Sequence, residues 1–337
     1  MTPQADSLGA ACDLAGRSEG SLGSPLAVLV LTCDEERNIG ACLDSVIGWA
    51  DQVLVVDSGS RDRTIELCAA RGVTVVHHDY LDHRSQMDWA ITSPLWKHDW
   101  LLLLDADNRV SSELKTQIDD VLRRDDNTVH GYYNPHHHYF RNRRVYGLKA
   151  YWLRLIRRGH VVVDQSELVD FRLVVNGPTG KLSGVIVESN QKELDIDFWI
   201  DKHQNFARRM AIEEILRKAG LMGWSKDLRP SLLGDPDQRM IWLKNRWYGM
   251  PTHWRAFAFF LYRYFFCLGF LGGSNGLIYY FLQALWFRLL VDLKMSEYRS
   301  LLRRGEITID DLVISVGLPV SAVSGAHARQ SATQNGS

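Results

Sequence analysis

Short apolar runs alternate with amphipathic stretches along the first third of the chain. Runs consisting mainly of Val and Leu, which favour β-strands, lie at 27–31, 53–56, 73–76 and 100–104. Between them apolar residues recur at helical spacing, around 39–47, up to Gly72 and over 84–91. The last apolar run has no polar face, so this strand must be covered on both sides. The pattern therefore predicts an α/β domain with a mostly parallel sheet and helices on both faces.

The second half of the chain changes character twice. Residues 131–155 show strand-like alternation interrupted by turns, and 194–219 carry apolar positions at helical spacing before Gly220. Residues 238–291 then combine long aromatic and aliphatic runs with six Lys or Arg and no Asp or Glu. The sequence thus predicts further strands, one long helix and a basic, apolar helical region.

Composition narrows the function classes. The chain has 337 residues, of which 46% are hydrophobic and 23% charged, so it can bury a full core. Lys plus Arg number 39 against 40 Asp plus Glu, a balance that argues against a nucleic-acid partner. The five cysteines show neither a disulfide framework nor a zinc-like spacing. We therefore expect a reducing, cytosolic setting.

Acidic residues follow the predicted strands. Asp57 comes directly after the second strand, and Asp105 and Asp107 follow the fourth. In a parallel sheet ligands bind beyond the carboxyl ends of the strands, where these side chains should meet. Neighbouring carboxylates repel unless a hard cation such as Mg²⁺ or Mn²⁺ lies between them, and both ions also bind phosphate oxygens. The alternative is that one aspartate simply caps the helix beginning near Ser111.

The three strand ends carry a recognisable set of motifs, in the order TCDEERNIGACLDSV, VLVVDSGSRDRT and LLLLDADNRVS. They resemble glycosyltransferase family 2, inverting nucleotide-sugar enzymes with the GT-A fold, and within it the lipopolysaccharide-core and exopolysaccharide subgroup. The resemblance covers 26 to about 126 well and continues more loosely to about 300. It implies that Asp107 and Asp105 hold the metal, with Asp107 the more direct ligand. It also implies nucleotide-sugar contacts by Thr32, Glu35, Asp57, Ser58, Ser60 and Asp105.

Further donor contacts are expected from amide and guanidinium side chains. Relatives often carry a Gln followed by a basic residue and Asn before the fourth strand. Here Gln86 matches but the next two residues do not, and Arg84 nearby is a candidate diphosphate ligand. Arg154 and Arg157 lie in LRLIRRG, which is similar to a strand motif of the family, and arginine suits phosphate oxygens. The alternative for Arg84 is a solvated helix position.

An inverting transfer needs a carboxylate base to take the proton of the attacking hydroxyl. Relatives usually place this acid in a His-Glu or Asp-Glu pair, which here reads Asp170-Phe171. Asp170 is therefore the expected base, and Glu167 is the alternative. The histidines at 136–138 are not expected to hold a metal, because consecutive strand residues point to opposite faces.

The basic region at 238–291 is expected to associate with a membrane. Its apolar runs are interrupted by Arg263 and Arg288, which makes a helix across the roughly 30 Å hydrocarbon core unfavourable. Two helices lying in the interface, with cations toward anionic lipid, explain the composition better. The alternative is a buried helical hairpin packed on the catalytic domain.

The sequence thus predicts a metal-dependent glycosyltransferase, held peripherally on the inner face of the cell membrane. It would transfer a sugar from a nucleotide diphosphate sugar, with UDP-sugars as the first candidates, to a lipid-linked or lipopolysaccharide glycan. The alternatives are a nucleotidyltransferase, which would need a glycine-rich basic loop after its first strand, and a catalytically silent GT-A-like scaffold.

The expected organisation follows from these assignments. The ends lack periodicity, and the start is not a signal peptide. We expect a disordered leader at 1–25, a GT-A catalytic domain at 26–220, a helical membrane-associating region at 221–316 and a disordered tail at 317–337. Within the catalytic domain, 26–126 is the nucleotide-sugar half and 127–220 the acceptor half.

Overall fold

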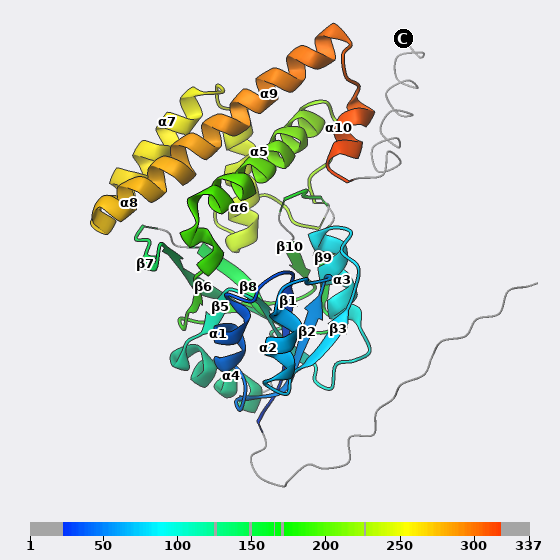
Figure 1. The fold of residues 1–337 in the computed structure, drawn as a ribbon. Coiled ribbons are helices and arrows are strands. Elements are labelled where there is room, and N and C mark those ends of the chain that lie inside the picture. The colour runs from blue at the N-terminus through cyan, green and yellow to red at the C-terminus, as the bar shows by residue number, and fades with distance from the viewer. Residues whose placement is uncertain are drawn as a thin grey trace, which may run out of the picture.

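The computed structural model describes residues 23–124, 127–147, 150–164, 166–169, 172–225 and 227–317. A mixed β-sheet flanked by helices forms one part of the molecule, and helices α5 to α10 form the other (Figure 1). The strand ends that carry the predicted site lie in the sheet part.

The first four strands form the parallel half of the sheet, in the order β3-β2-β1-β4. Side chains of β1 alternate between two buried faces, with Val28 and Val30 on one side and Ala27 and Leu29 on the other. Helices α1, α2 and α4 cover the first face and α3 covers the second, which confirms the predicted two-sided covering. These elements are β1 (Ser24–Thr32), α1 (Ile39–Asp44), β2 (Ala50–Asp57), α2 (Thr64–Ala69), β3 (Thr74–His77), α3 (His83–Thr92), β4 (Trp100–Asp105) and α4 (Ser112–Arg124).

The other half of the sheet makes it mixed. Strand β8 pairs with β4 in the antiparallel direction, and β6 pairs with β8. Strand β12 lies between β6 and β5, so 186–188 sit beside 108–110 although they are far apart in the sequence. The strands of this half are β5 (Asn108–Val110), β6 (Gly131–Phe140), β7 (Arg143–Arg144), β8 (Ala150–Arg157), β11 (Thr179–Lys181) and β12 (Ile186–Glu188). Strands β9 (Val161–Asp164) and β10 (Arg172–Val175) pair with each other in a separate antiparallel two-stranded sheet.

The helical part is built on the long helix α5, which packs along α9. The segment from α7 to η4 folds back on itself, and Tyr279, Tyr280 and Ala284 of its inner face pack against Phe140 and Trp199. The elements are η1 (Gln191–Leu194), α5 (Ile196–Lys218), α6 (Pro236–Gly249), α7 (Trp254–Leu261), η2 (Tyr262–Phe266), η3 (Gly269–Gly272), α8 (Gly273–Tyr280), η4 (Phe281–Trp286), α9 (Phe287–Arg304) and α10 (Ile309–Ser315).

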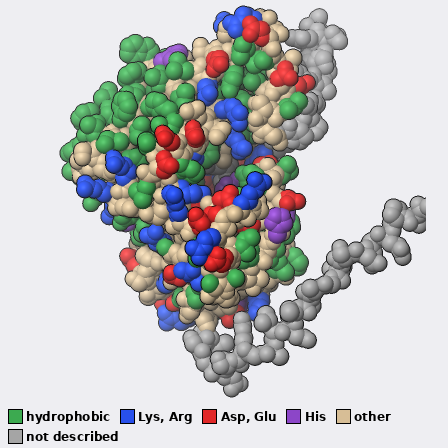
Figure 2. Space-filling model, viewed as in Figure 1, with side chains coloured by type: hydrophobic (Ala, Val, Ile, Leu, Met, Phe, Trp, Pro, Cys, Tyr) green, Lys and Arg blue, Asp and Glu red, His purple; other side chains and the backbone are tan. Residues whose placement is uncertain are grey.

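One helical stretch among the described residues, Gly269–Arg304, has the length and composition to cross a membrane. This is a weak indication, because the core helix of a soluble protein passes the same test. The second half of the stretch, α9, packs on α5. Hydrophobic side chains gather on the surface over the region of α7 and α8 (Figure 2).

Candidate active site

Asp105 is the last residue of β4, at the carboxyl end of the parallel strands. Its Oδ2 accepts a hydrogen bond from Nη2 of Arg154 on β8 at 2.8 Å. Burial would raise the pKa of Asp105, but the positive charges of Arg154 and His83 and the hydrogen bond from Arg154 together lower it. Asp105 is thus an ionised carboxylate with a cationic partner already in place.

Asp107 lies in the turn after β4, where its Oδ1 accepts a hydrogen bond from Nδ2 of Asn108 at 2.9 Å. Burial raises the pKa of Asp107 to about 8, and the negative charges of Glu188 and Asp105 add to this effect. Ser111, and not Asp105 or Asp107, accepts the hydrogen bond from the backbone N–H of Leu114 at the start of α4. The helix-capping alternative is therefore wrong, and Asp107 sits in an excess of negative charge.

Glu188 is a third carboxylate at this position, and the sequence did not point to it. Strand β12 places it between β5 and β6. Its oxygens lie 3.2 Å from Nδ1 of His138 and 3.8 Å from Nδ1 of His136. Burial would raise the pKa of Glu188, but the two histidines hold it well below its usual range. The two histidines share one face of β6, as strand alternation requires.

The donor set at this strand end suits a hard cation that arrives with a diphosphate. Among the described residues, no group of three or more Asp, Glu, His or Cys is arranged to hold a metal ion. Mg²⁺ and Mn²⁺ need only one or two protein carboxylates, since water and phosphate oxygens complete the shell. Because Arg154 engages Asp105, Asp107 is the better placed of the two aspartates to bind such an ion.

The end of β1 lies beside these residues, since β1 and β4 are paired neighbours with Leu31 opposite Asp105. Thr32 ends the strand and is buried. Beyond it, Oε2 of Glu35 accepts a hydrogen bond from Nδ2 of Asn38 at 2.6 Å, and Oε1 lies 2.5 Å from Nζ of Lys192. Glu35 therefore connects the β1 end to the segment after β12.

The turn after β2 is organised by the carboxylate of Asp57, which is 1% exposed. Its Oδ2 accepts hydrogen bonds from the backbone N–H groups of Gly59 at 2.8 Å and Ser60 at 2.9 Å, and its Oδ1 accepts one from the Ser60 hydroxyl. Gly59 has a φ of 92°, a conformation that favours glycine. Nε2 of Gln86 donates to Oγ of Ser58 at 3.1 Å, so Gln86 and Ser58 meet at this edge.

Arg84 and Arg157 were also predicted to contact the donor, and the structure places them differently. Arg84 is buried rather than solvated, and its Nη2 lies 3.0 Å from Oδ2 of Asp82. Arg157 was expected near the donor, and this prediction is wrong. Because β8 runs antiparallel to β4, Arg157 lies opposite Trp100 at the start of β4, about 17 Å of strand from Asp105.

Of the two base candidates, Asp170 lies outside the described residues. Glu167 is buried, with its oxygens 3.0 Å from Nη2 of Arg172 and 3.3 Å from Nζ of Lys244. A carboxylate held between two cations is poorly available to take a proton from a hydroxyl. The structure therefore gives Glu167 a role in joining the sheet part to α6.

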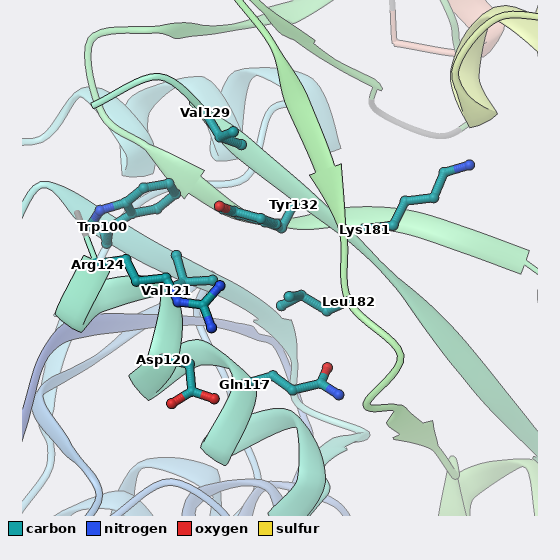
Figure 3. Close-up of a pocket in the computed structure, with 9 residues that line it drawn as sticks. All are labelled: Trp100, Gln117, Asp120, Val121, Arg124, Val129, Tyr132, Lys181 and Leu182. Atoms are coloured by element: carbon teal, nitrogen blue, oxygen red, sulfur yellow. The ribbon is translucent and has the colours of Figure 1, made fainter. Parts of the chain in front are cut away.

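A separate pocket of about 300 Å³ lies away from these strand ends. Figure 3 shows Trp100, Tyr132, Val121 and Arg124 gathered around it, with the amino group of Lys181 pointing away. Trp100 starts β4, whereas Asp105 ends it. The pocket is therefore at the opposite end of this strand from the carboxylates.

The segment that contains these strand ends matches a known protein family. Residues 27–171 match the sequence model of Glycosyl transferase family 2. This segment belongs to glycosyl transferase family 2. It begins in β1 and contains Asp57, Asp105 and Asp107, and it confirms the resemblance drawn from the three motifs.

Relatives of the family 2 segment include an uncharacterized glycosyltransferase of Rickettsia bellii, 34% identical over 30% of this chain and 34% of the relative. A TPR repeat-containing protein of Synechococcus elongatus is 30% identical over 44% of this chain and 38% of its own. The lipopolysaccharide core biosynthesis glycosyltransferase LpsC of Rhizobium meliloti is 28% identical over 46% and 59%. The chain thus spans about a third of the length of the first two relatives.

Solved structures similar to the chain include glucosyl-3-phosphoglycerate synthase of Mycobacterium tuberculosis in complex with Mn²⁺, UDP and phosphoglyceric acid. It is 17% identical over 33% of this chain and 43% of that one, with a TM-score of 0.27. Mannosyl-3-phosphoglycerate synthase of Rubrobacter xylanophilus is 21% identical over 34% and 40%, with a TM-score of 0.29.

Proposed function

We propose that this protein is an inverting glycosyltransferase that moves a sugar from a nucleotide diphosphate sugar to a lipid-linked or lipopolysaccharide glycan. The observation that carries the proposal is the group of carboxylates Asp105, Asp107 and Glu188 at the end of β4, within a family 2 segment. A group of this kind suits the cation-bound diphosphate of a sugar donor.

Asp107 would hold Mg²⁺ or Mn²⁺, with Asp105 beside it. When bound, the cation compensates the charge that develops on the leaving diphosphate. Arg154 keeps Asp105 ionised and oriented through its 2.8 Å hydrogen bond. When the cation takes the place of the Asp107 proton, its positive charge would also compensate the negative charges of Asp107, Asp105 and Glu188.

The nucleotide would lie along the ends of β1 and β2. Thr32 and Glu35 line the first, and the turn built by Asp57 lines the second. The hydrogen bond from Gln86 to Ser58 closes this edge. The organised turn therefore offers a preformed surface to the base and ribose, for which a UDP-sugar is the first candidate.

The transfer step needs one base. The acceptor hydroxyl attacks the anomeric carbon, the bond from that carbon to the diphosphate oxygen breaks, and the carboxylate of Asp170 takes the hydroxyl proton. The proposal for Asp170 rests on its position in the sequence motif, and the two ion pairs of Glu167 support it by removing the main rival.

The similarity to LpsC supports an acceptor of the lipopolysaccharide type and a place on the cytoplasmic side of the membrane. The acid-free sequence at 238–291 supports the same location, because anionic lipid attracts cations. The acceptor would then reach the site from the membrane surface.

A donor panel tests the proposal. We expect one UDP-, GDP- or dTDP-sugar to raise the thermal unfolding midpoint with Mn²⁺, and to be slowly hydrolysed to free sugar and nucleoside diphosphate without acceptor. A nucleotidyltransferase would instead release pyrophosphate from a nucleoside triphosphate. Binding without hydrolysis or transfer would identify a silent scaffold, and either result would overturn the proposal.

A further inference from the structure

Helices α7 and α8 carry large apolar side chains on the face that points away from the protein. Trp254, Phe257, Leu261 and Phe265 recur at spacings of three and four, so they line one side of α7 and η2. Trp254 is 76% exposed, and Phe266 is 81% exposed. We call the exposed side chains of Trp254, Phe257, Leu261, Phe265, Phe266 and Phe281 the outer apolar face (Figure 2).

Folding of the chain does not account for this face. The opposite side of the same helices already supplies the packing, since Phe259, Phe260 and Tyr264 lie against a buried cluster around Tyr280. A helix that packs on one side normally presents polar residues on the other. Contiguous exposed apolar surface of this kind marks an interaction site.

The segment that carries the outer apolar face is basic. Residues 238–291 contain no Asp or Glu. Arg141, in the turn after β6, and Arg143, at the start of β7, are both exposed. The chain around β7 is fixed to α8, because Tyr280 donates a hydrogen bond to the carbonyl of Tyr146 and Nδ2 of Asn275 donates one to the carbonyl of Phe140. An apolar face on a segment that contains cations and no acids complements lipid tails next to lipid phosphates.

Neither arm of the segment from α7 to α9 is suited to cross a bilayer: the first arm is too short, and the second is held by buried ion pairs. The 8 residues of α7 and the 5 of η2 span at most about 20 Å, against a hydrocarbon core of roughly 30 Å. Helix α9 is fixed by Arg255, whose Nε lies 2.9 Å from Oδ1 of Asp292 and whose Nη2 lies 2.8 Å from Oε2 of Glu214. A spanning helix at 269–304 would have to break these buried ion pairs.

We propose that the outer apolar face lies side-on in the headgroup region of an anionic bilayer, with Arg141 and Arg143 at the lipid phosphates. This deepens the proposed function and rests on it for the lipid-linked acceptor. The contact would fix which side of the enzyme faces the membrane.

Co-sedimentation of the full chain with vesicles tests the inference. We expect binding to vesicles of phosphatidylcholine with phosphatidylglycerol, weaker binding at high salt and little binding to phosphatidylcholine alone. Phe266→Ser with Phe257→Ser should lower the partition coefficient at least about tenfold, because two exposed aromatic side chains leave the interface. Ile314→Ser, which changes an exposed apolar side chain of α10, is the matched control and should bind like the native protein.

A second pair of variants tests the charge contribution. Arg141→Gln with Arg143→Gln should weaken binding and reduce its salt dependence, whereas Arg63→Gln with Arg123→Gln, two exposed arginines elsewhere, should do neither. Unchanged binding by the aromatic variant would overturn the inference, as would extraction from membranes by detergent alone. Donor hydrolysis is measured separately on the native protein and the variants. If none of them hydrolyses the donor, the proposed function is refuted, while the vesicle-binding result still stands.

Discussion

The carboxyl group of Asp107 is held where a negative charge is unfavourable. Burial, followed by the charges of Glu188 and Asp105, raises its pKa to about 8. A raised aspartate pKa means that stability present at low pH is lost as the pH rises from 3.8 through about 8. We therefore expect Asp107→Asn to raise the thermal unfolding midpoint of chelator-treated protein, and to raise it more at pH 8.5 than at pH 6.

Asp44 provides the control for this prediction. The hydrogen bond from Arg71 lowers the pKa of Asp44, so Asp44→Asn should not stabilise the protein. The unfolding midpoints are measured by circular dichroism. If Asp107→Asn changes the midpoint equally at both pH values, the surroundings of Asp107 do not disfavour its negative charge.

The buried carboxylate of Glu167 has a different role from that proposed for Asp170. Removing one partner of a buried ion pair costs about 3–5 kcal/mol, so Glu167→Gln should lower the free energy of unfolding by that order. Its folded fraction should keep the native kcat. Asp170→Asn should instead lower kcat strongly with donor binding kept. Urea unfolding combined with initial rates separates the two, and a stable but inactive Glu167→Gln would reverse the assignment.

At the scale of elements, α5, α7 and α9 are held together by a buried charge cluster. Arg255 makes a bidentate contact with Glu214 on α5, with Nη1 and Nη2 at 2.9 and 2.8 Å, and pairs with Asp292 on α9. Asp292→Asn should lower the free energy of unfolding by about 3–5 kcal/mol in denaturant. Glu66→Gln, which breaks the exposed pair with Arg63, should change it little. Equal effects of the two variants would contradict the buried role.

The parallel strands and their acidic ends could be predicted because a local pattern determines them. Asp57, Asp105 and Asp107 follow apolar runs directly, and their strand ends meet as expected. Glu188 could not be found in this way, since only the pairing of β12 with β5 and β6 brings it there. The error for Arg157 has a related cause: the antiparallel direction of β8 reverses which of its ends lies at the site.

At the scale of the whole molecule, a buried network joins the sheet part to the helical part. Nη1 of Arg172 on β10 lies 2.6 Å from Oδ1 of Asp237 on α6, and the hydroxyl of Tyr133 on β6 donates to the same carboxylate at 2.7 Å. We therefore expect the two parts to unfold together in a single calorimetric transition. Two separate transitions would show that the network does not couple them.

We expect Asp107 to support metal-dependent turnover of a nucleotide sugar. The most direct measurement is the release of nucleoside diphosphate from the donor found in the panel, with Mn²⁺ and with excess chelator, for the native protein and for Asp107→Ala. We expect Mn²⁺-dependent release by the native protein and none by the variant under either condition, with the variant folded by circular dichroism. Full activity of the native protein in chelator, together with an active Asp107→Ala, would show that neither a metal ion nor Asp107 takes part in turnover.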